Sequence, residues 1–476
     1  MFHITWKIFT YLLEFYVAGV VFVCLLCRMF LRSGTLLRSL ANVSVHTCLR
    51  FQTAVISVSG ACSESVKNLQ HRDMFPAHEM VLNQMRHDVL LQDAYKHRVV
   101  DKTRPCKEIL KGKQGILGQS DPAARQQLKE LTQQELIDFV EQLAHMAVSQ
   151  EKLDTNLMQI VEDECCFQAK NMNTVEMLLV ADAFFMMRYS YLCSRYYSAM
   201  FREFEHRWMH MTIQKEDIVQ LAVCIVTYRK FPLLLVQNIE QFVCSHMDKF
   251  SACELSIICS AFFMTNTSLR SVELMDKLTD AVLSSIPSGE LKAYQLGSIL
   301  KALRHAHFAK ISFWENLGNL LSSLPAFQNE FMLTDLSNVA FAYASLKISH
   351  STLFAGLSSH AVKLIENQTA MRLKDVGRLV WSFALLQEPL DEVVQNHLLF
   401  ILRRDVYLME QFSEAFVESL LGLAMQKIYP VDLLQRLFST KLLMQKHGMV
   451  DTMLSCTVLF SMFVFYFYCS VLPSAF

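Results

Sequence analysis

The stretch LTDLSNVAFAYASLKI (333–348) carries apolar side chains at the first, fourth, fifth and eighth positions counted from Leu336. Offsets of three, four and seven residues place side chains on one face of an α-helix. The pattern occurs eight times, and its first residues are Leu136, Met177, Ile218, Leu255, Leu296, Leu336, Val376 and Phe416. The steps between them are 41, 41, 37, 41, 40, 40 and 40 residues. A steady period of this length indicates stacked structural repeats.

A second segment with helical periodicity follows several of these patterns. Examples are residues 233–247, 271–286, 352–365 and 393–404. Each repeat is therefore predicted to be a helical hairpin, which cannot cover its own apolar face and must stack on its neighbours. The sequence predicts an all-α fold, an α-solenoid of about eight helical-hairpin repeats of ~40 residues. Such a fold favours a long binding surface over an enclosed pocket.

Composition supports helices and gives no bias toward one partner. Among 476 residues there are only 13 glycines and 9 prolines, and the net charge is −1. A neutral chain weakens the case for nucleic-acid binding but leaves room for a local stripe of cations. The 14 cysteines include no paired Cys-x-x-Cys motifs with zinc spacing. We expect no metal and no cofactor.

Catalytic motifs are missing from the sequence. It contains neither a phosphate-binding P-loop nor a G-x-S-x-G nucleophile motif. The triplet His71-Arg72-Asp73 resembles that of protein kinases, but His78 stands where a kinase has asparagine. We expect that the protein is not an enzyme.

The N-terminal region has two predicted parts. Residues 1–28 include an apolar stretch long enough to span a bilayer, and we interpret it as a signal anchor or an upstream gene-model extension before Met29. Residues 29–63 contain arginine, serine and leucine on a helical period, and no acid occurs until Glu64. This composition is typical of a mitochondrial presequence. Residues 64–128 are predicted to be a linker with some helix.

The C-terminal end is also apolar. Helical repeats are predicted for residues 129–372, and a further repeat-like module for 373–440. Residues 441–476 form an apolar tail in which Met453 to Leu472 carry no charge. Two interpretations stay open, a tail anchor and read-through of non-coding sequence.

Basic residues recur near the first helix of several repeats and are candidate RNA-binding residues. They are Arg229, Lys230, Lys301, Arg304, Lys347, Arg372, Lys374 and Arg378. Equivalent positions in a solenoid line up, so these cations can follow a phosphate backbone while Tyr228, Tyr294 and Tyr343 stack on bases. An ordinary solvated face is the alternative. Aromatic residues at the eighth position, such as Phe184, Phe262, Tyr343 and Phe383, are predicted to be core.

Five stretches carry a family resemblance. They are MNTVEMLLVADAFF (172–185), CELSIICSAFFMTNTSL (253–269), LTDLSNVAFAYASLKI (333–348), LKDVGRLVWSFALLQ (373–387) and LLGLAMQKIYPVDLLQRLFS (420–439). Together they resemble the FAST kinase domain-containing family of mitochondrial RNA regulators over roughly residues 130–440. The module at 373–440 resembles the leucine-rich FAST module of that family. The family usually continues into a second FAST module and a RAP domain, which we expect to be missing from a C-terminally truncated chain.

The resemblance implies a mitochondrial matrix protein, associated with RNA granules or nucleoids, that acts on mitochondrial transcripts. It implies single-stranded mitochondrial RNA as the partner, together with other RNA-granule proteins. Membrane contact is expected only if the apolar ends belong to the protein. Two alternatives stay open from the residues themselves: a helical-repeat scaffold that binds proteins without RNA, and a membrane-anchored helical protein.

Overall fold

The computed structural model describes residues 81–100, 121–148, 154–187, 194–324, 330–367, 371–404 and 413–439. Its regular elements in these ranges are all helical. The first helices of the repeats are α7 (Gln133–Val148), α9 (Thr174–Met186), α11 (Lys215–Tyr228), α13 (Ala252–Met264), α15 (Ala293–His305), α18 (Leu333–Leu346), α20 (Leu373–Leu386) and α23 (Ser413–Met425).

The second helices alternate with them along the chain. They are α6 (Asp121–Lys129), α8 (Thr155–Gln168), α10 (Arg195–Arg207), α12 (Leu233–Ser245), α14 (Val272–Ser285), α16 (Ile311–Ser323), α19 (Ser351–Glu366), α21 (Glu392–Arg404) and α24 (Val431–Ser439). Short 3-10 or π turns are η1 (Arg86–Leu90), η2 (Asp93–Tyr95), η5 (Trp208–His210) and η6 (Met247–Lys249).

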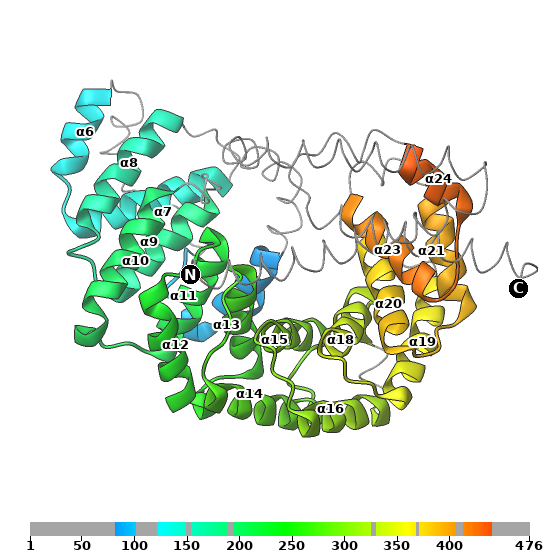
Figure 1. Cartoon of the computed structure of the whole chain (residues 1–476). Coiled ribbons are helices and arrows are strands. Elements are labelled where there is room, and N and C mark those ends of the chain that lie inside the picture. Colours follow the sequence, from blue (N-terminus) through cyan, green and yellow to red (C-terminus); the bar gives the residue numbers. More distant parts are fainter. Residues whose placement is uncertain are drawn as a thin grey trace, which may run out of the picture. The chain divides into compact units, whose positions relative to one another are not determined.

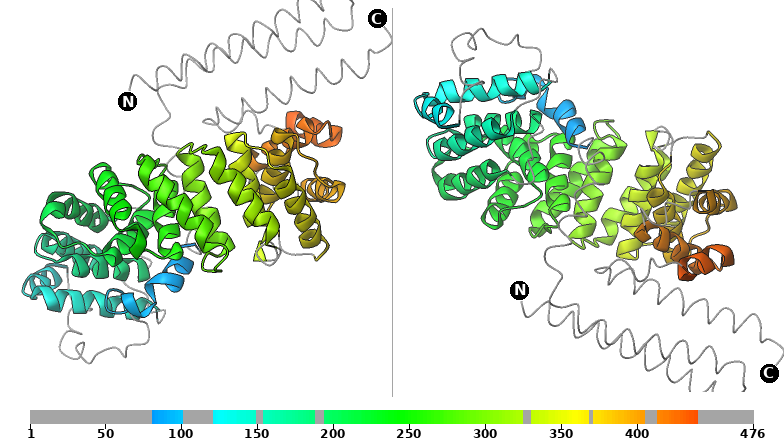
Figure 2. Two further views of the ribbon diagram at one scale, coloured as in Figure 1. Left: turned by 90° about the horizontal axis from the view of Figure 1, so that it is seen from below. Right: turned by 90° about the horizontal axis from the view of Figure 1, so that it is seen from above.

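These helices form two rows (Figure 1). In the first-helix row each member packs on the next, in the order α7, α9, α11, α13, α15, α18, α20 and α23. In the second-helix row the order of contacts is α6, α8, α10, α12, α14, α16, α19 and α21. Figure 2 shows the same succession of neighbours from two further sides. The predicted all-α helical-repeat solenoid is confirmed.

Burial of the periodic residues explains the stacking. The residues that open the eight patterns are at most 3% exposed, and they are Leu136, Met177, Ile218, Leu255, Leu296, Leu336, Val376 and Phe416. Each also lies within a single continuous hydrophobic core. Full burial of one such side chain stabilises the fold by about 1.5–3 kcal/mol. Since each contact is shared by adjacent repeats, no repeat is stable without its neighbours.

The turn between the two helices of a repeat has a recurring backbone geometry. Six first helices are followed by a residue with φ between 53° and 64°, namely Arg229, Asn266, His307, Lys347, Gln387 and Lys427. Each lies eleven residues after the first residue of its pattern, as Lys347 does after Leu336. In five of the turns the next residue donates its N–H to the carbonyl five residues back, at 2.9–3.0 Å. This left-handed cap closes the helix and reverses the chain.

Acidic residues close the other end of several first helices. Asp217, Glu254 and Asp335 each accept the backbone N–H three residues earlier, at 2.7–3.0 Å. These acids lie at the N-terminal ends of the helices, where their negative charge also interacts favourably with the helix dipole. Two such carboxylates also bind the preceding first helix. Lys215 Nζ lies 3.0 Å from Glu254 Oε1, and Thr334 Oγ1 donates to Asp375 at 2.8 Å.

Glycine allows α20 and α23 to approach closely. A Cβ atom added at Gly422 would lie 2.9 Å from the backbone Cα and N of Trp381 on α20. Real Cβ atoms do not come so close, so the two helices would have to separate. At Gly297 the added Cβ would be 3.4 Å from the Asn338 side chain, which is an ordinary contact.

We therefore expect Gly422→Ala to lower the free energy of unfolding by about 1–3 kcal/mol, because overpacking displaces the backbone of α20. Gly297→Ala is the matched control and should be neutral or slightly stabilising, since alanine favours helix. Denaturant unfolding followed by circular dichroism measures both. Equal stability of the two variants would contradict the close approach.

Residues 81–100, which we call the N-terminal strap, pack against the first-helix row (blue in Figure 1). Asp88 accepts a hydrogen bond from the Tyr294 hydroxyl of α15. Tyr95, which is fully buried, donates to Glu254 of α13 at 2.6 Å. The backbone carbonyl of Arg98 accepts from Gln220 of α11 at 2.8 Å. From Asp88 to Val100 the strap thus contacts α15, α13, α11 and α9, in the order opposite to the chain.

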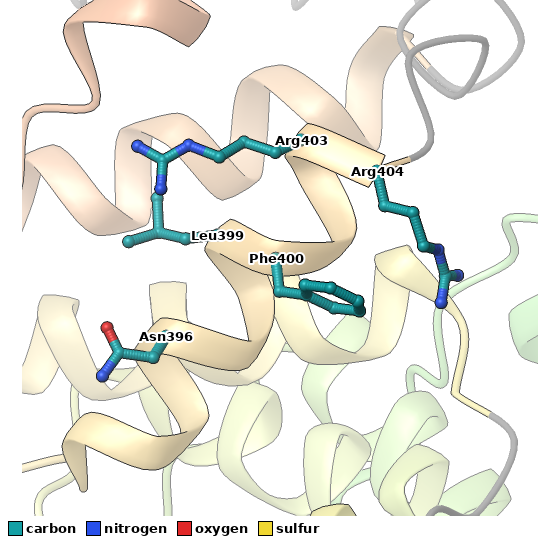
Figure 3. Close-up of a pocket in the computed structure, with 5 residues that line it drawn as sticks. All are labelled: Asn396, Leu399, Phe400, Arg403 and Arg404. Atoms are coloured by element: carbon teal, nitrogen blue, oxygen red, sulfur yellow. The ribbon is translucent and has the colours of Figure 1, made fainter.

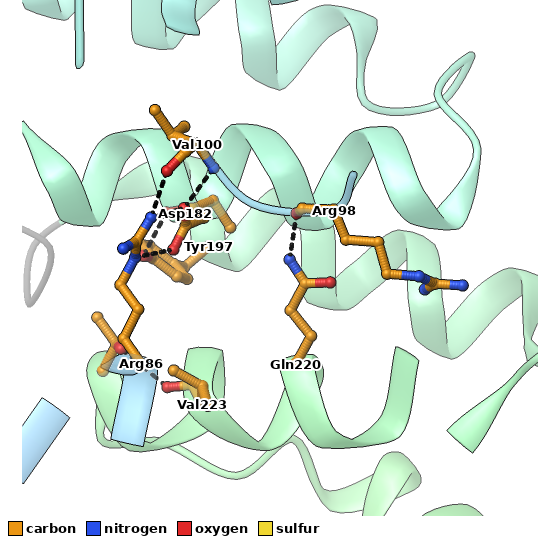
Figure 4. Close-up of polar contacts among 9 residues, drawn as sticks. Arg86, Arg98, Val100, Asp182, Tyr197, Gln220 and Val223 are labelled. Atoms are coloured by element: carbon orange, nitrogen blue, oxygen red, sulfur yellow. Dashed lines mark hydrogen bonds and ion pairs between the residues drawn. The ribbon is translucent and has the colours of Figure 1, made fainter. Parts of the chain in front are cut away.

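Two buried ion pairs hold the strap. Arg86 Nε and Nη2 each lie 3.0 Å from an Asp182 oxygen on α9, and Asp182 also accepts the Val100 N–H at 2.9 Å (Figure 4). Arg98 pairs with Asp217 of α11. All four charged side chains are at most 6% exposed. Burial of these charges is compensated because each finds an opposite charge and further hydrogen bonds.

Removing one residue of a buried ion pair tests how much the pair contributes to stability. We expect Asp182→Ala to cost about 3–5 kcal/mol, because the Arg86 guanidinium stays buried without its counter-charge. The matched control is Asp432→Ala, which breaks a similar bidentate pair with Arg403 that is about half exposed. That loss should be below about 1 kcal/mol. Similar losses in the two variants, measured by chemical denaturation, would contradict the buried pair.

Several sequence predictions fall on other parts of the chain. The apolar segment 1–28, the presequence 29–63 and the tail 441–476 lie outside the described residues. The predicted linker, 64–128, includes the strap, and its packing had no counterpart in the sequence pattern because it depends on single charged residues. Within the described ranges, no helix has both the length and the apolar character needed to cross a membrane.

Candidate nucleic-acid interface

Cationic and aromatic side chains alternate across four neighbouring first helices. The members of this aromatic–cation column are Phe263 (α13), Lys301 and Arg304 (α15), Phe341 (α18), and Arg378 and Trp381 (α20). They project from helices that pack in succession in the first-helix row. Each of these residues lies two to eight positions after the first residue of its repeat pattern.

Phe341 lies at the centre of the column. The guanidinium carbons of Arg304 and Arg378 are 4.5 and 4.7 Å from the centroid of its ring. The Trp381 ring centroid is 5.4 Å from that of Phe341. On the other side, Lys301 Nζ and the Arg304 guanidinium carbon each lie 5.8 Å from the Phe263 centroid. These distances are typical of cation–π contacts.

The cations of the column repel one another. Partial burial is the main cause that lowers the pKa of Lys301, to about 8, and the nearby Arg378 adds to it. Burial and Arg378 likewise lower the pKa of Arg304 to about 10. Asp335 and Asp375 act in the opposite direction on Lys301. Among the described residues, no ion pair joins Lys301 or Arg304 to a carboxylate, so the excess positive charge favours an anion.

The carboxyl group of Asp335 is also affected by burial and by its neighbour Lys301. Burial raises the pKa of this carboxyl group above its ordinary value, whereas the Met332 backbone N–H and Lys301 lower it. Its oxygen already accepts the Met332 N–H at 3.0 Å. Asp335 therefore caps α18 and neutralises the charge of Lys301 only in part.

Rings and guanidinium groups in such a layer suit single-stranded nucleic acid. Exposed aromatic faces stack on bases with little sequence preference, and cations neutralise the phosphates. Arg304, Phe341, Arg378 and Trp381 are all partly exposed, so a ligand can reach them. None of the six side chains of the column is a nucleophile beside a proton acceptor. What this arrangement supports is binding.

The structure brings three of the eight predicted basic residues together, namely Lys301, Arg304 and Arg378. The other five lie at the helix ends. Arg229, Lys230 and Lys347 follow the C-terminal ends of α11 and α18, whereas Arg372 and Lys374 lie at the start of α20. Lys230 lies over the Tyr228 ring at 5.3 Å.

Arg372 is already engaged within the protein. Its Nε donates to Asp375 at 2.7 Å, and its Nη2 donates to the Thr334 hydroxyl at 3.2 Å. Lys374 is exposed beside it. This end of α20 is therefore a capping network, separate from the column.

The aromatic residues of the column differ from those we expected to stack on bases. Tyr343 is fully buried, and its hydroxyl donates to the Trp314 carbonyl at 2.6 Å, so of its two interpretations the base platform is wrong and the core position is confirmed. Tyr294 donates to Asp88 of the strap. The Tyr228 ring stacks on Tyr197 with a centroid distance of 5.9 Å.

Aromatic residues at the eighth position are core, as predicted. Phe184, Phe262, Tyr343 and Phe383 are at most 1% exposed. Sequence reasoning missed Phe341 and Trp381, each five residues after the first residue of its pattern. Their signal was an aromatic residue at the same offset in adjacent repeats, on the side of the helix away from the core.

A second feature is a hollow of about 570 Å³ on the second-helix row (Figure 3). Its lining residues are Asn396, Leu399, Phe400, Arg403 and Arg404, all from α21. Arg403 is bonded to Asp432 at 2.9 and 3.1 Å, and the Arg404 guanidinium lies 5.4 Å from the Phe400 centroid. Since one helix supplies every lining residue, the hollow is a surface groove without converging groups.

Metal binding has no candidate position in the part of the chain that is described. No three His, Cys, Asp or Glu side chains come together there in a way that could hold an ion. The six described cysteines form no disulfide, and burial raises the pKa of Cys259 to about 12 and that of Cys253 to about 11. Both thiols are therefore protonated at neutral pH, Cys259 within the core and Cys253 in a partly buried position.

The fold and the column define an all-α helical-repeat protein with a candidate surface for single-stranded nucleic acid. Comparison with known proteins adds a relationship. The chain is 24% identical over 279 residues to FAST kinase domain-containing protein 5, mitochondrial, of Mus musculus, which covers 58% of this chain. It is 25% identical over 282 residues to the Homo sapiens protein of the same name, covering 59% of this chain.

A third relative of that name, from Pongo abelii, is 24% identical over 286 residues. The chain spans about a third of the length of these relatives, since the match covers 35% of each. No family model matches the chain. The similarity supports a family-level relationship to FAST kinase domain-containing protein 5, in agreement with the resemblance seen in the sequence.

Lys301 allows a test of the electrostatics of the column. We expect Lys301→Met to raise the free energy of unfolding at pH 7 by about 1–2 kcal/mol, because a charged ammonium group in this partly buried place is unfavourable. The pKa of about 8 lies below the ordinary value of 10.5. Between these values the unfolded chain binds more protons, so stability of the unsubstituted protein rises with pH there.

The gain from Lys301→Met should accordingly be full below pH 8 and smaller at pH 9. Urea unfolding at pH 7 and at pH 9 measures this gain in stability. Lys363→Met, at an exposed position of α19, is the control and should change little at either pH. A gain that is absent at pH 7, or equal at the two pH values, would contradict the lowered pKa.

Proposed function

We propose that this chain is a mitochondrial RNA-binding protein that supports the processing, maturation or stability of mitochondrial transcripts. The observation that carries the proposal is the aromatic–cation column, in which Arg304 and Arg378 lie on the Phe341 ring and Lys301 and Arg304 form no ion pair with a carboxylate among the described residues. The relatives named mitochondrial favour that compartment for this chain. In this proposal the protein works in the matrix, with RNA granules or nucleoids.

The column suits single-stranded rather than double-stranded RNA. Bases of a single strand are free to stack on Phe341 and Trp381, whereas paired bases are not. Phosphates then lie near Lys301 and Arg304, which relieves the repulsion between the cations of adjacent helices. Binding through a helical-repeat surface needs no cofactor, and we propose that the chain itself performs no chemical reaction.

The competing function is a scaffold that binds proteins. It is favoured by one observation, the strap, in which a segment with short helical turns is held by first helices through Asp182 and Asp217. Those carboxylates are already occupied by arginines of the same chain. The column has the opposite charge and still offers exposed rings, so it favours the RNA function.

Crosslinking tests the proposal directly. Ultraviolet irradiation of isolated mitochondria that express the tagged full chain should retain RNA on the protein, and sequencing identifies the transcripts. A chain that retains no more RNA than an unrelated matrix protein would remove the RNA function and favour the scaffold. Pull-down from the same organelles then reports protein partners.

Substitutions in the column should weaken binding in two distinguishable ways. Phe341→Leu should reduce affinity for a single-stranded oligoribonucleotide roughly 5- to 100-fold with little change in salt dependence, because stacking is lost. Arg304→Gln with Arg378→Gln should lower the slope of log affinity against log salt by about 1.4, at ~0.7 per phosphate contact. Fluorescence anisotropy at several salt concentrations measures both.

The matched control is Arg403→Gln, on α21 in the second-helix row. It removes a cation that is paired with Asp432 and should leave both affinity and slope unchanged. If the column variants bind as tightly as this control, the column is not the RNA site.

A further inference from the structure

The left-handed turn residues share a second property besides their backbone. All six carry a nitrogen-bearing side chain: Arg229, Asn266, His307, Lys347, Gln387 and Lys427. Five of them are exposed, and Arg229 is partly exposed. We call these six residues the turn row. None is glycine, although glycine is the usual residue for this conformation.

The identity of these residues is unusual for their backbone. A positive φ disfavours lysine, arginine, histidine and glutamine, whereas glycine adopts it freely and asparagine tolerates it. A cation near a helix C-terminus gains from the helix dipole, which accounts for Lys347 or Lys427. The dipole does not account for Gln387 or Asn266, which are neutral. What all six have in common is the ability to donate a hydrogen bond.

Their positions form a continuous series. The first helices α11, α13, α15, α18, α20 and α23 pack one on the next, so each repeat places one turn-row side chain at the same end of the first-helix row. Acidic caps and the strap lie at the opposite ends of these helices, as Asp217 and Glu254 show. Donors therefore collect at one end and carboxylates at the other.

The turn row also lies close to the aromatic–cation column along the helix axes. Arg304 precedes His307 by three residues, and Phe341 precedes Lys347 by six. At 1.5 Å per helical residue these separations are about 4.5 and 9 Å along the axis. A polymer that stacks its bases on the column would therefore have its backbone within reach of this end of the helices.

We infer that the turn row binds the sugar–phosphate backbone of single-stranded RNA, one donor per repeat, while the column stacks on its bases. The inference rests on the proposed function, since it assigns a second set of contacts to the same ligand. Hydrogen-bond donors of either charge bind phosphate oxygens and hydroxyl groups of the ribose, so neutral and cationic members of the row serve the same purpose.

Glycine substitutions separate this role from folding. The full chain is compared with a variant carrying Arg229→Gly, His307→Gly, Lys347→Gly and Lys427→Gly. Glycine fits the left-handed backbone, so the thermal unfolding midpoint should stay the same or rise. Affinity for a single-stranded oligoribonucleotide should fall by about tenfold or more, and the salt slope by about 2, at ~0.7 for each of three permanent cations.

The matched control removes three cations at the second helices, with Lys277→Gln in α14, Lys310→Gln directly before α16 and Lys363→Gln in α19. A second variant, Asn266→Gly with Gln387→Gly, removes only neutral donors. It should weaken binding without changing the salt slope, a result that helix-dipole compensation alone does not produce.

The outcomes distinguish the two proposals. If the fourfold glycine variant binds with the affinity and salt slope of the lysine control, while Phe341→Leu loses affinity, the turn row is not an RNA contact and the proposed function stands. If the unsubstituted full chain does not bind the oligoribonucleotide at all, both proposals are wrong.

Discussion

Every other feature of this protein depends on the burial of an apolar helix face that no repeat can cover alone. Leu336, Val376 and their counterparts are shared between neighbouring hairpins. The constraint sets the succession of first helices, and that succession brings side chains from distant parts of the sequence to one surface. Arg304 and Arg378, 74 residues apart in the chain, meet on one ring because α15, α18 and α20 are stacked.

The fold was predictable because its signal is periodic, whereas the surface depends on individual contacts. The pattern at Leu136 and its equivalents predicted the helices and their stacking. It also predicted that Phe262 and Phe383 are core, and both are buried. Lys301, Arg304 and Arg378 were candidates from charge alone, but the central role of Phe341 depends on which helix follows which. The strap could not be predicted, since Arg86 and Asp182 are 96 residues apart and belong to no repeat.

Charge is distributed unevenly along the first helices. Carboxylates that cap the N-terminal ends are neutralised by backbone N–H groups and by arginines of the strap, as at Asp217. Lys301 and Arg304 of the column form no ion pair with a carboxylate among the described residues, and burial keeps the pKa of Lys301 low. A neutral chain can thus present a locally positive surface, because its negative charges are used internally. The net charge of the chain alone does not reveal this locally positive surface.

The strap has a consequence for how the chain acquires its structure. A ribosome releases the N-terminal part first, so Arg86 and Tyr95 emerge long before the helices that receive them. Tyr294 follows Asp88 by 206 residues. Until α9 to α15 have formed, the two arginines and the tyrosine lack their carboxylate partners, and docking them closes a very long loop. Such non-local contacts slow folding. We therefore expect the strap to dock late, on a first-helix row that has already assembled.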